Sequence, residues 1–188
     1  MLEVIRAAND IQFVCDDEEW RFCFIGGVAL QRWGEPRETI DVYLTILTGF
    51  GNESRYIEVL IRHFRPRIHA AAEFALKNRV LLLEAVSGVG IDVALGGLRF
   101  EELAVERASP YTYPPGVTLR TCSAEDLVVM KAFSDRSRDW ADLEGIILRQ
   151  RDKLDRDYVY AQLAPLAELK ESPELVNRLR ALDRKLQT

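Results

Sequence analysis

The stretch that decides the fold is FCFIGGVALQRWGEPRETIDVYLTIL, residues 22–47. The apolar run Phe22–Ile25 predicts a short strand, which ends at a pair of glycines. The next residues, Val28–Trp33, fit about two turns of helix before the following Gly and Pro. Ile40–Leu47 is rich in β-branched and aromatic residues and predicts a second strand. The local order is therefore strand, glycine pair, helix and strand.

The glycine pair, Gly26 and Gly27, opens the predicted helix. The first N–H groups of a helix have no partner inside the helix, and the helix dipole adds positive potential there, so this corner suits an anion such as a triphosphate. Asp41, near the start of the second strand, would lie beside that anion. A divalent cation could then bridge the carboxylate and the phosphates.

A second acid, Asp92, lies in the predicted strand Ile91–Leu95, the returning arm of a hairpin that begins with Arg79–Val86. A carboxylate among apolar neighbours is costly to bury unless a cation or a hydrogen-bond donor compensates it. The residues leave two alternatives open. Asp92 belongs to a functional site, or it faces solvent from the surface of its strand.

The run GGVALQRWGEPRETIDVYLTI resembles the signature of the polymerase-β-like nucleotidyltransferase superfamily, in which a glycine turn precedes D-x-D on the next strand. The similarity is strongest to minimal bacterial members, including the AbiEii-like toxins of type IV abortive infection, and covers roughly residues 20–150. It implies an NTP substrate with Mg²⁺ or Mn²⁺. Gly26 and Gly27 would hold the triphosphate, and Asp41 and Asp92 would act as catalytic metal ligands.

A second resemblance lies in AEDLVVMKAFSDRSRDWADLEGI, residues 124–146, which is similar to the helix pair that follows the sheet in these proteins. It implies that Lys131 is a catalytic residue contacting the nucleotide's phosphates. It also implies that Asp139 and Asp142, with Arg138, orient the nucleotide or line the same cleft. The alternative is a charged amphipathic helix pair whose surface ion pairs contribute little to stability.

Two further residues stand in the loop before Asp41. The resemblance implies that Arg37 and Thr39 shape the approach to the metal and that Arg37 contacts phosphate. The alternative for Arg37 is an arginine that braces its own loop.

Tyr43 stands where the family pattern has its second Asp. Alternate residues of a strand face the same side, so D-x-D presents two carboxylates together. The phenol of Tyr43 is neutral at pH 7, with an ordinary pKa of about 10, and is a poor ligand for Mg²⁺. Three explanations stay open. Tyr43 is an inactivating change, natural or engineered, in an otherwise intact enzyme, or the chain belongs to a branch that kept the fold for binding. Alternatively, another acid replaces the missing Asp, and Glu38 is the nearest candidate.

Composition limits the partners. The net charge of −5 and pI near 5.2 argue against a broad nucleic-acid surface but leave room for a local basic pocket for a nucleotide or a tRNA end. The three cysteines have no metal-ligand spacing, which indicates reduced, structural thiols in a cytoplasmic protein. No signal peptide is recognisable, and no stretch reaches the roughly 18 apolar residues that a membrane span needs.

We therefore expect an α/β (α+β) fold with a small mixed sheet of four or five strands flanked by helices. Residues 1–122 would form the nucleotidyltransferase-like core and residues 123–188 a helical part packed on it, or both one continuous domain, with a linker at Ser109–Gly116. The expected function is NMP transfer from an NTP to an RNA such as tRNA, or to a protein, with the nucleotide in the cleft between the two parts. An antitoxin is a possible partner. The alternative is an inactive protein of this fold that binds a nucleotide or a partner.

Overall fold

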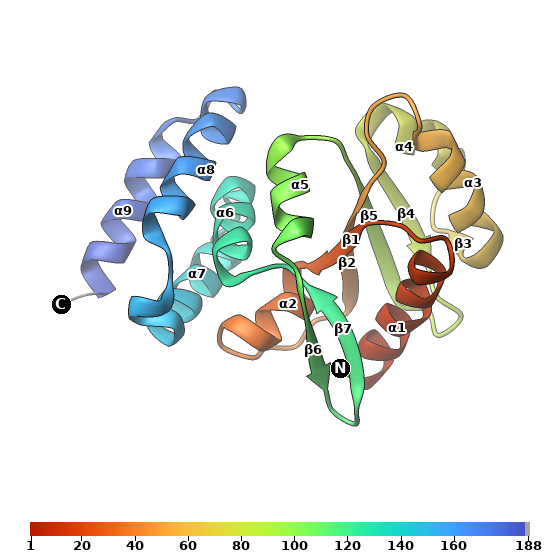
Figure 1. Ribbon diagram of the computed structural model, residues 1–188, viewed down its shortest axis with the longest axis horizontal. Helices are drawn as coiled ribbons and strands as arrows, with labels where there is room; N and C mark the ends of the chain where they lie inside the picture. Colours follow the sequence, from red (N-terminus) through yellow and green to blue (C-terminus); the bar gives the residue numbers. More distant parts are fainter. Residues whose placement is uncertain (187–188) are drawn as a thin grey trace. The chain divides into compact units, whose positions relative to one another are not determined.

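The computed structural model describes residues 1–186 of the chain and has an α/β architecture, as the sequence predicts (Figure 1). Its strands are β1 (Phe22–Ile25), β2 (Asp41–Leu47), β3 (Arg65–Pro66), β4 (Val80–Glu84), β5 (Gly90–Gly96), β6 (Ser109–Tyr113) and β7 (Val117–Thr121). Its helices are α1 (Leu2–Asp17), α2 (Gly26–Trp33), α3 (Glu53–His63), α4 (Ala71–Asn78), α5 (Arg99–Glu106), α6 (Ala124–Ser134), α7 (Ser137–Gln150), α8 (Arg156–Leu169) and α9 (Glu174–Leu186), with a 3₁₀ turn at Arg151–Lys153.

The chain divides into two compact units. The first unit comprises Met1–Val28 and Glu38–Cys122, and the second comprises Ala29–Arg37 and Ser123–Thr188. The boundary falls inside α2, so the helix begins in one unit and ends in the other. Residues 187 and 188, the end of the helical part expected at 123–188, lie outside the described residues.

All strands of the first unit belong to one mixed sheet, in the order β3-β4-β5-β2-β1-β7-β6. The central strand β2 runs antiparallel to β1 and parallel to β5. Parallel neighbours need a long crossover between them, and the chain between β2 and β5 supplies it with α3, α4 and the short strands β3 and β4. The site residues on β2 and β5 are therefore distant in sequence and adjacent in the sheet.

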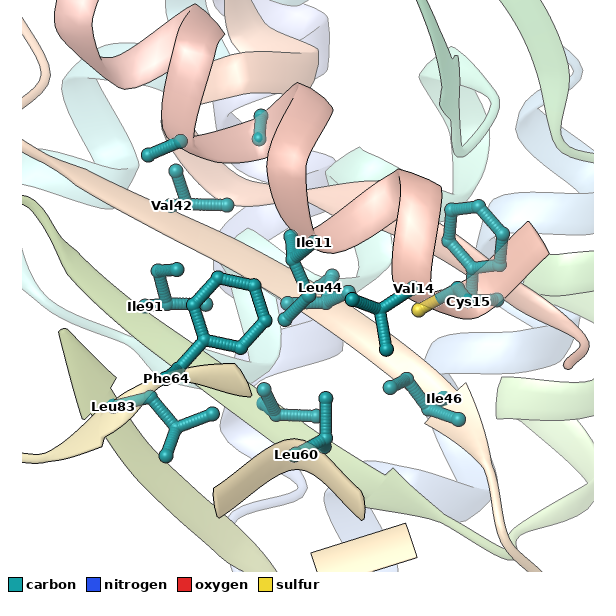
Figure 2. Packing of buried hydrophobic residues seen from close by; sticks show 14 of the residues in the cluster. Ile11, Val14, Cys15, Val42, Leu44, Ile46, Leu60, Phe64, Leu83 and Ile91 are labelled. Atoms are coloured by element: carbon teal, nitrogen blue, oxygen red, sulfur yellow. The ribbon is translucent and has the colours of Figure 1, made fainter. Parts of the chain in front are cut away.

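Alternation along β2 separates the core from the site. Val42, Leu44 and Ile46 are fully buried and pack with residues of α1 and α3, such as Ile11 and Leu60 (Figure 2). Since successive side chains of a strand point to opposite faces, the residues between them face the other side of the sheet. The apolar face thus fixes which side of the sheet presents the charged residues.

The prediction of a linker at Ser109–Gly116 is wrong. Ser109–Tyr113 forms β6, which pairs antiparallel with β7 in a hairpin. Pro110 is tolerated because β6 is an edge strand, where a missing N–H breaks no ladder bond on the open side. With β6 and the two-residue β3, the sheet has seven strands instead of the four or five expected.

The second unit contains α6 to α9 and the part of α2 after Val28. α6 packs against α7, α8 and α9. Its start is capped by Ser123, whose hydroxyl accepts a hydrogen bond from the backbone N–H of Asp126. Among residues 1–186, no helix is both long enough and apolar enough to cross a lipid bilayer.

Candidate functional site

The glycine corner (Gly26 and Gly27) lies where β1 ends and α2 begins, as predicted. Gly26 has φ +59°, a left-handed backbone conformation that residues other than glycine rarely adopt. The side chain of Tyr43 packs against this backbone, because a Cβ on Gly26 would lie 3.2 Å from the Tyr43 Cβ and 3.3 Å from its ring. Tyr43 therefore fills the space beside the corner on the strand next to β1.

Thr39 holds the start of β2 close to the same corner. It is 8% exposed, and its Cβ lies 2.7 Å from the place where a Cβ on Gly27 would stand. Its hydroxyl donates a hydrogen bond to the carbonyl of Asp41 at 3.3 Å. The close approach requires glycine at position 27, and Thr39 serves the geometry of the corner through these contacts.

Asp41 and Asp92 share one face of the sheet. In the parallel register of β2 and β5, Asp92 is the partner of Tyr43, and Asp41 is the partner of Gly90 two residues earlier. Burial raises the pKa of Asp92; Arg67 opposes that rise, and the negative charge of Asp41 adds to it. The two acids thus interact electrostatically from neighbouring strands.

Arg67 completes this site, although nothing in the sequence predicts its presence there. It follows β3, and its guanidinium forms an ion pair with the carboxylate of Asp92. It also approaches Asp41, since a Cβ on Gly90 would lie 2.7 Å from Arg67 Nη1 and 2.5 Å from Asp41 Oδ1. We call Asp41, Asp92 and Arg67 the sheet cluster. No spacing in the sequence signals it, because the contact arises from the pairing of a two-residue strand.

The described residues do not fit the two-metal centre that the resemblance implies. Two adjacent Mg²⁺ ions need several anionic oxygen ligands, and nowhere in residues 1–186 are three or more His, Cys, Asp or Glu residues placed to hold an ion. Tyr43 supplies no carboxylate, and Glu38, which is exposed, does not complete a set with the two acids. The Arg67 guanidinium already faces that pair.

The second unit holds a different group of charges around Lys131. Lys131, on α6, is 4% exposed, and its ammonium group donates to Asp139 Oδ1 at 3.0 Å and to Asp142 Oδ2 at 2.6 Å. Both carboxylates come from α7. The predicted phosphate donor is therefore bound by two acids of its own unit.

Two arginines complete this group. Arg37 forms a bidentate ion pair with Asp142, in which Nε and Nη2 each donate to one carboxylate oxygen at 2.7 Å. Arg136 Nε donates to Asp139 at 2.7 Å. Burial alone would raise the pKa of each carboxyl, but the hydrogen bonds from Arg136, Arg37 and Lys131 outweigh it and hold both pKa values below their usual range. We call these five residues the helix cluster.

The predicted site residues fall into two groups, one in each unit. The first unit contains Gly26, Gly27, Thr39, Asp41 and Asp92, and the second contains Arg37, Lys131, Asp139 and Asp142. Within each unit the members contact one another, directly or through one intervening residue. That both groups line one cleft stays a prediction.

No protein-family model and no curated protein matches the sequence. Among solved structures, the chain is similar to an antigenic nucleotidyltransferase-like protein from Paracoccidioides brasiliensis, with TM-score 0.52, 16% identity and coverage of 95% of this chain and 93% of that one. Weaker similarities are to the lincosamide antibiotic adenylyltransferase LnuA with lincomycin bound (TM-score 0.47, 12% identity, 72% and 91% covered) and to ANT(2")-Ia in complex with adenylyl-2"-tobramycin (0.45, 17%, 100% and 97%). The first similarity shows a nucleotidyltransferase-like fold.

Proposed function

We propose that this nucleotidyltransferase-like chain binds a nucleoside triphosphate at the glycine corner and does not carry out efficient two-metal nucleotidyl transfer. The observation that carries the proposal is the position of Tyr43. It packs on Gly26 and lies opposite Asp92 in the register of β2 and β5. The family pattern has its second carboxylate at this position. The fold is thus retained while the set of metal ligands is incomplete.

Phosphate binding is supported by the charges around the corner. α2 begins at Gly26, so its first N–H groups and its dipole attract an anion. Tyr43 packs on Gly26, and its register partner on β5 is Asp92, whose ion pair with Arg67 brings a guanidinium to the same face of the sheet. A guanidinium binds phosphate oxygens in a fixed geometry, so both ends of this row favour phosphate.

Inefficient transfer is supported by the ligand count. In-line attack on the α-phosphate with loss of pyrophosphate relies on two cations that activate the nucleophile and stabilise the leaving oxygens. Asp41 and Asp92 provide two carboxylates, and the neutral phenol of Tyr43 replaces the third. The catalytic power that a two-metal centre supplies is therefore missing.

A second candidate is an active nucleotidyltransferase that modifies an RNA or a protein. One observation favours it: Asp41 and Asp92 lie on the same face of neighbouring strands, close enough for Asp41 to raise the pKa of Asp92. In that case another group compensates for Tyr43. A toxin with a protein antitoxin would be one form of this candidate.

One experiment separates the two candidates. The purified protein is incubated with each α-labelled NTP, Mg²⁺ and total tRNA, beside Tyr43→Asp and the matched control Tyr43→Phe, and NTP binding is measured in parallel by calorimetry. We expect binding but no transfer by the wild type and by Tyr43→Phe. Transfer by the wild type would favour the second candidate, and failure to bind any NTP would contradict both. Transfer by Tyr43→Asp alone would identify Tyr43 as the disabling residue.

A further inference from the structure

The sheet cluster has a positive charge of its own at the position where this fold is expected to hold a metal. We propose that the Arg67 guanidinium occupies the cation position of the Asp41–Asp92 pair, so that the wild-type site excludes divalent ions and Arg67 contacts an anionic ligand directly. The proposal concerns the charge at the site and holds whether or not the ligand is a nucleotide.

Strand pairing fixes the position of the Arg67 backbone. In β3, Arg65 and Pro66 pair with Glu84 and Leu83 of β4, and the ladder continues as the N–H of Arg67 donates to the carbonyl of Leu82 at 3.0 Å. Leu82 is in turn the register partner of Asp92 on β5. The Arg67 side chain therefore has to span only one strand to reach the carboxylate.

The absence of a side chain at Gly90 brings the charges together. Gly90 lies opposite Asp41 on β2, and a Cβ there would collide with both Asp41 Oδ1 and Arg67 Nη1, at 2.5 and 2.7 Å. Both charged atoms thus lie close to one point above the Gly90 backbone. Because Arg67 is also paired with Asp92, a single guanidinium faces both acids.

The charge of the guanidinium would keep a divalent ion out of the Asp41–Asp92 site. A divalent ion bound by Asp41 and Asp92 would lie within a few ångströms of the guanidinium, and two like charges at that distance repel strongly in a half-buried site. The guanidinium is always charged, so the ion cannot gain access through its deprotonation. Its five donors exceed what the pair with Asp92 uses, so it keeps donors for an anion.

A purely structural ion pair is the competing explanation. The side chains of Arg67 and Asp92 are 30% and 20% exposed, and pairs with this access to water contribute little to stability. Replacing Arg67 by Ala should therefore leave the fold intact. The two explanations differ in a measurable way, because only a guanidinium at the cation position controls metal binding.

The test is Mn²⁺ binding without nucleotide, followed by calorimetry and by the EPR signal of free Mn²⁺. We expect Arg67→Ala to bind Mn²⁺ at least tenfold more tightly than the wild type. The matched control Arg65→Ala removes a neighbouring arginine, 75% exposed and paired with Glu84, and should behave as the wild type. Arg67→Ala combined with Asp92→Asn should lose the gain, with circular dichroism and thermal unfolding confirming that each variant is folded.

One result would overturn the proposal: a folded Arg67→Ala whose Mn²⁺ affinity is no higher than that of the wild type. This holds whether both proteins bind Mn²⁺ and lose it on Asp92→Asn, or neither binds it. Since no nucleotide enters the experiment, its failure is distinguishable from a failure of the chain to bind an NTP.

Discussion

The sheet cluster and the helix cluster both combine two aspartates with basic side chains, but they differ in burial and in charge balance. The sheet cluster has two acids and one guanidinium, and its ion pair is partly open to water. In the helix cluster three cations surround two carboxylates that are almost fully buried. One cluster has unused capacity for a ligand, and the other is saturated by its own residues.

This difference separates a structural role from a binding role. A buried charge is tolerated only when its partners satisfy it, and removing one partner of a buried pair is strongly destabilising. A partly exposed pair contributes little to stability and is free to exchange partners with a ligand. We therefore infer that the helix cluster stabilises the second unit, and we propose that the sheet cluster binds a ligand.

The largest expected effect comes from Lys131→Met, which leaves Asp139 and Asp142 buried without the cation that joins them. We expect the free energy of unfolding to fall by about 3 kcal/mol, the cost of breaking a buried ion pair. Urea denaturation followed by circular dichroism measures it. The exposed Lys153→Met serves as the control, and a loss of less than about 1 kcal/mol in Lys131→Met would place the helix cluster with ordinary surface pairs.

A smaller loss of unfolding free energy is expected at low pH. The folded-state pKa values of Asp139 and Asp142 lie below their unfolded values, so the stability they contribute is present above the unfolded pKa of about 3.9 and is lost as pH falls through the folded values. The difference in unfolding free energy between wild type and Asp142→Asn should therefore shrink from pH 7 to pH 3, by about 1.3 kcal/mol at most, because pH 3 lies only about one unit below the unfolded pKa. A difference that stays constant with pH would contradict the assignment.

The elements that position the glycine corner could be predicted because their signals are local. The apolar run before Gly26 and the β-branched run after Ile40 each specify a strand within a few residues. The edge strand β6 was missed because the prolines at 110, 114 and 115 indicate a loop, and only its position at the edge of the sheet makes Pro110 acceptable.

The contents of the two clusters were harder to predict. Asp92 could be predicted as a site residue because an acid among apolar residues needs a partner. The partner, Arg67, could not be predicted, because it reaches Asp92 through the pairing of a two-residue strand that no sequence periodicity indicates. Lys131 lies in a charged helix pair whose pattern is also typical of a solvated surface. Its burial depends on how α6 packs against α7, which is tertiary information.

The most direct test of the account is a titration of the ¹⁵N-labelled 21.5 kDa protein with each NTP in Mg²⁺ buffer, following the backbone amide signals. We predict saturable shifts of the Gly26 and Gly27 amides, with smaller shifts on the adjoining face of β2 and β5. If no NTP shifts the Gly26 and Gly27 amide signals, nucleotide binding at the glycine corner is contradicted, whether or not signals elsewhere shift.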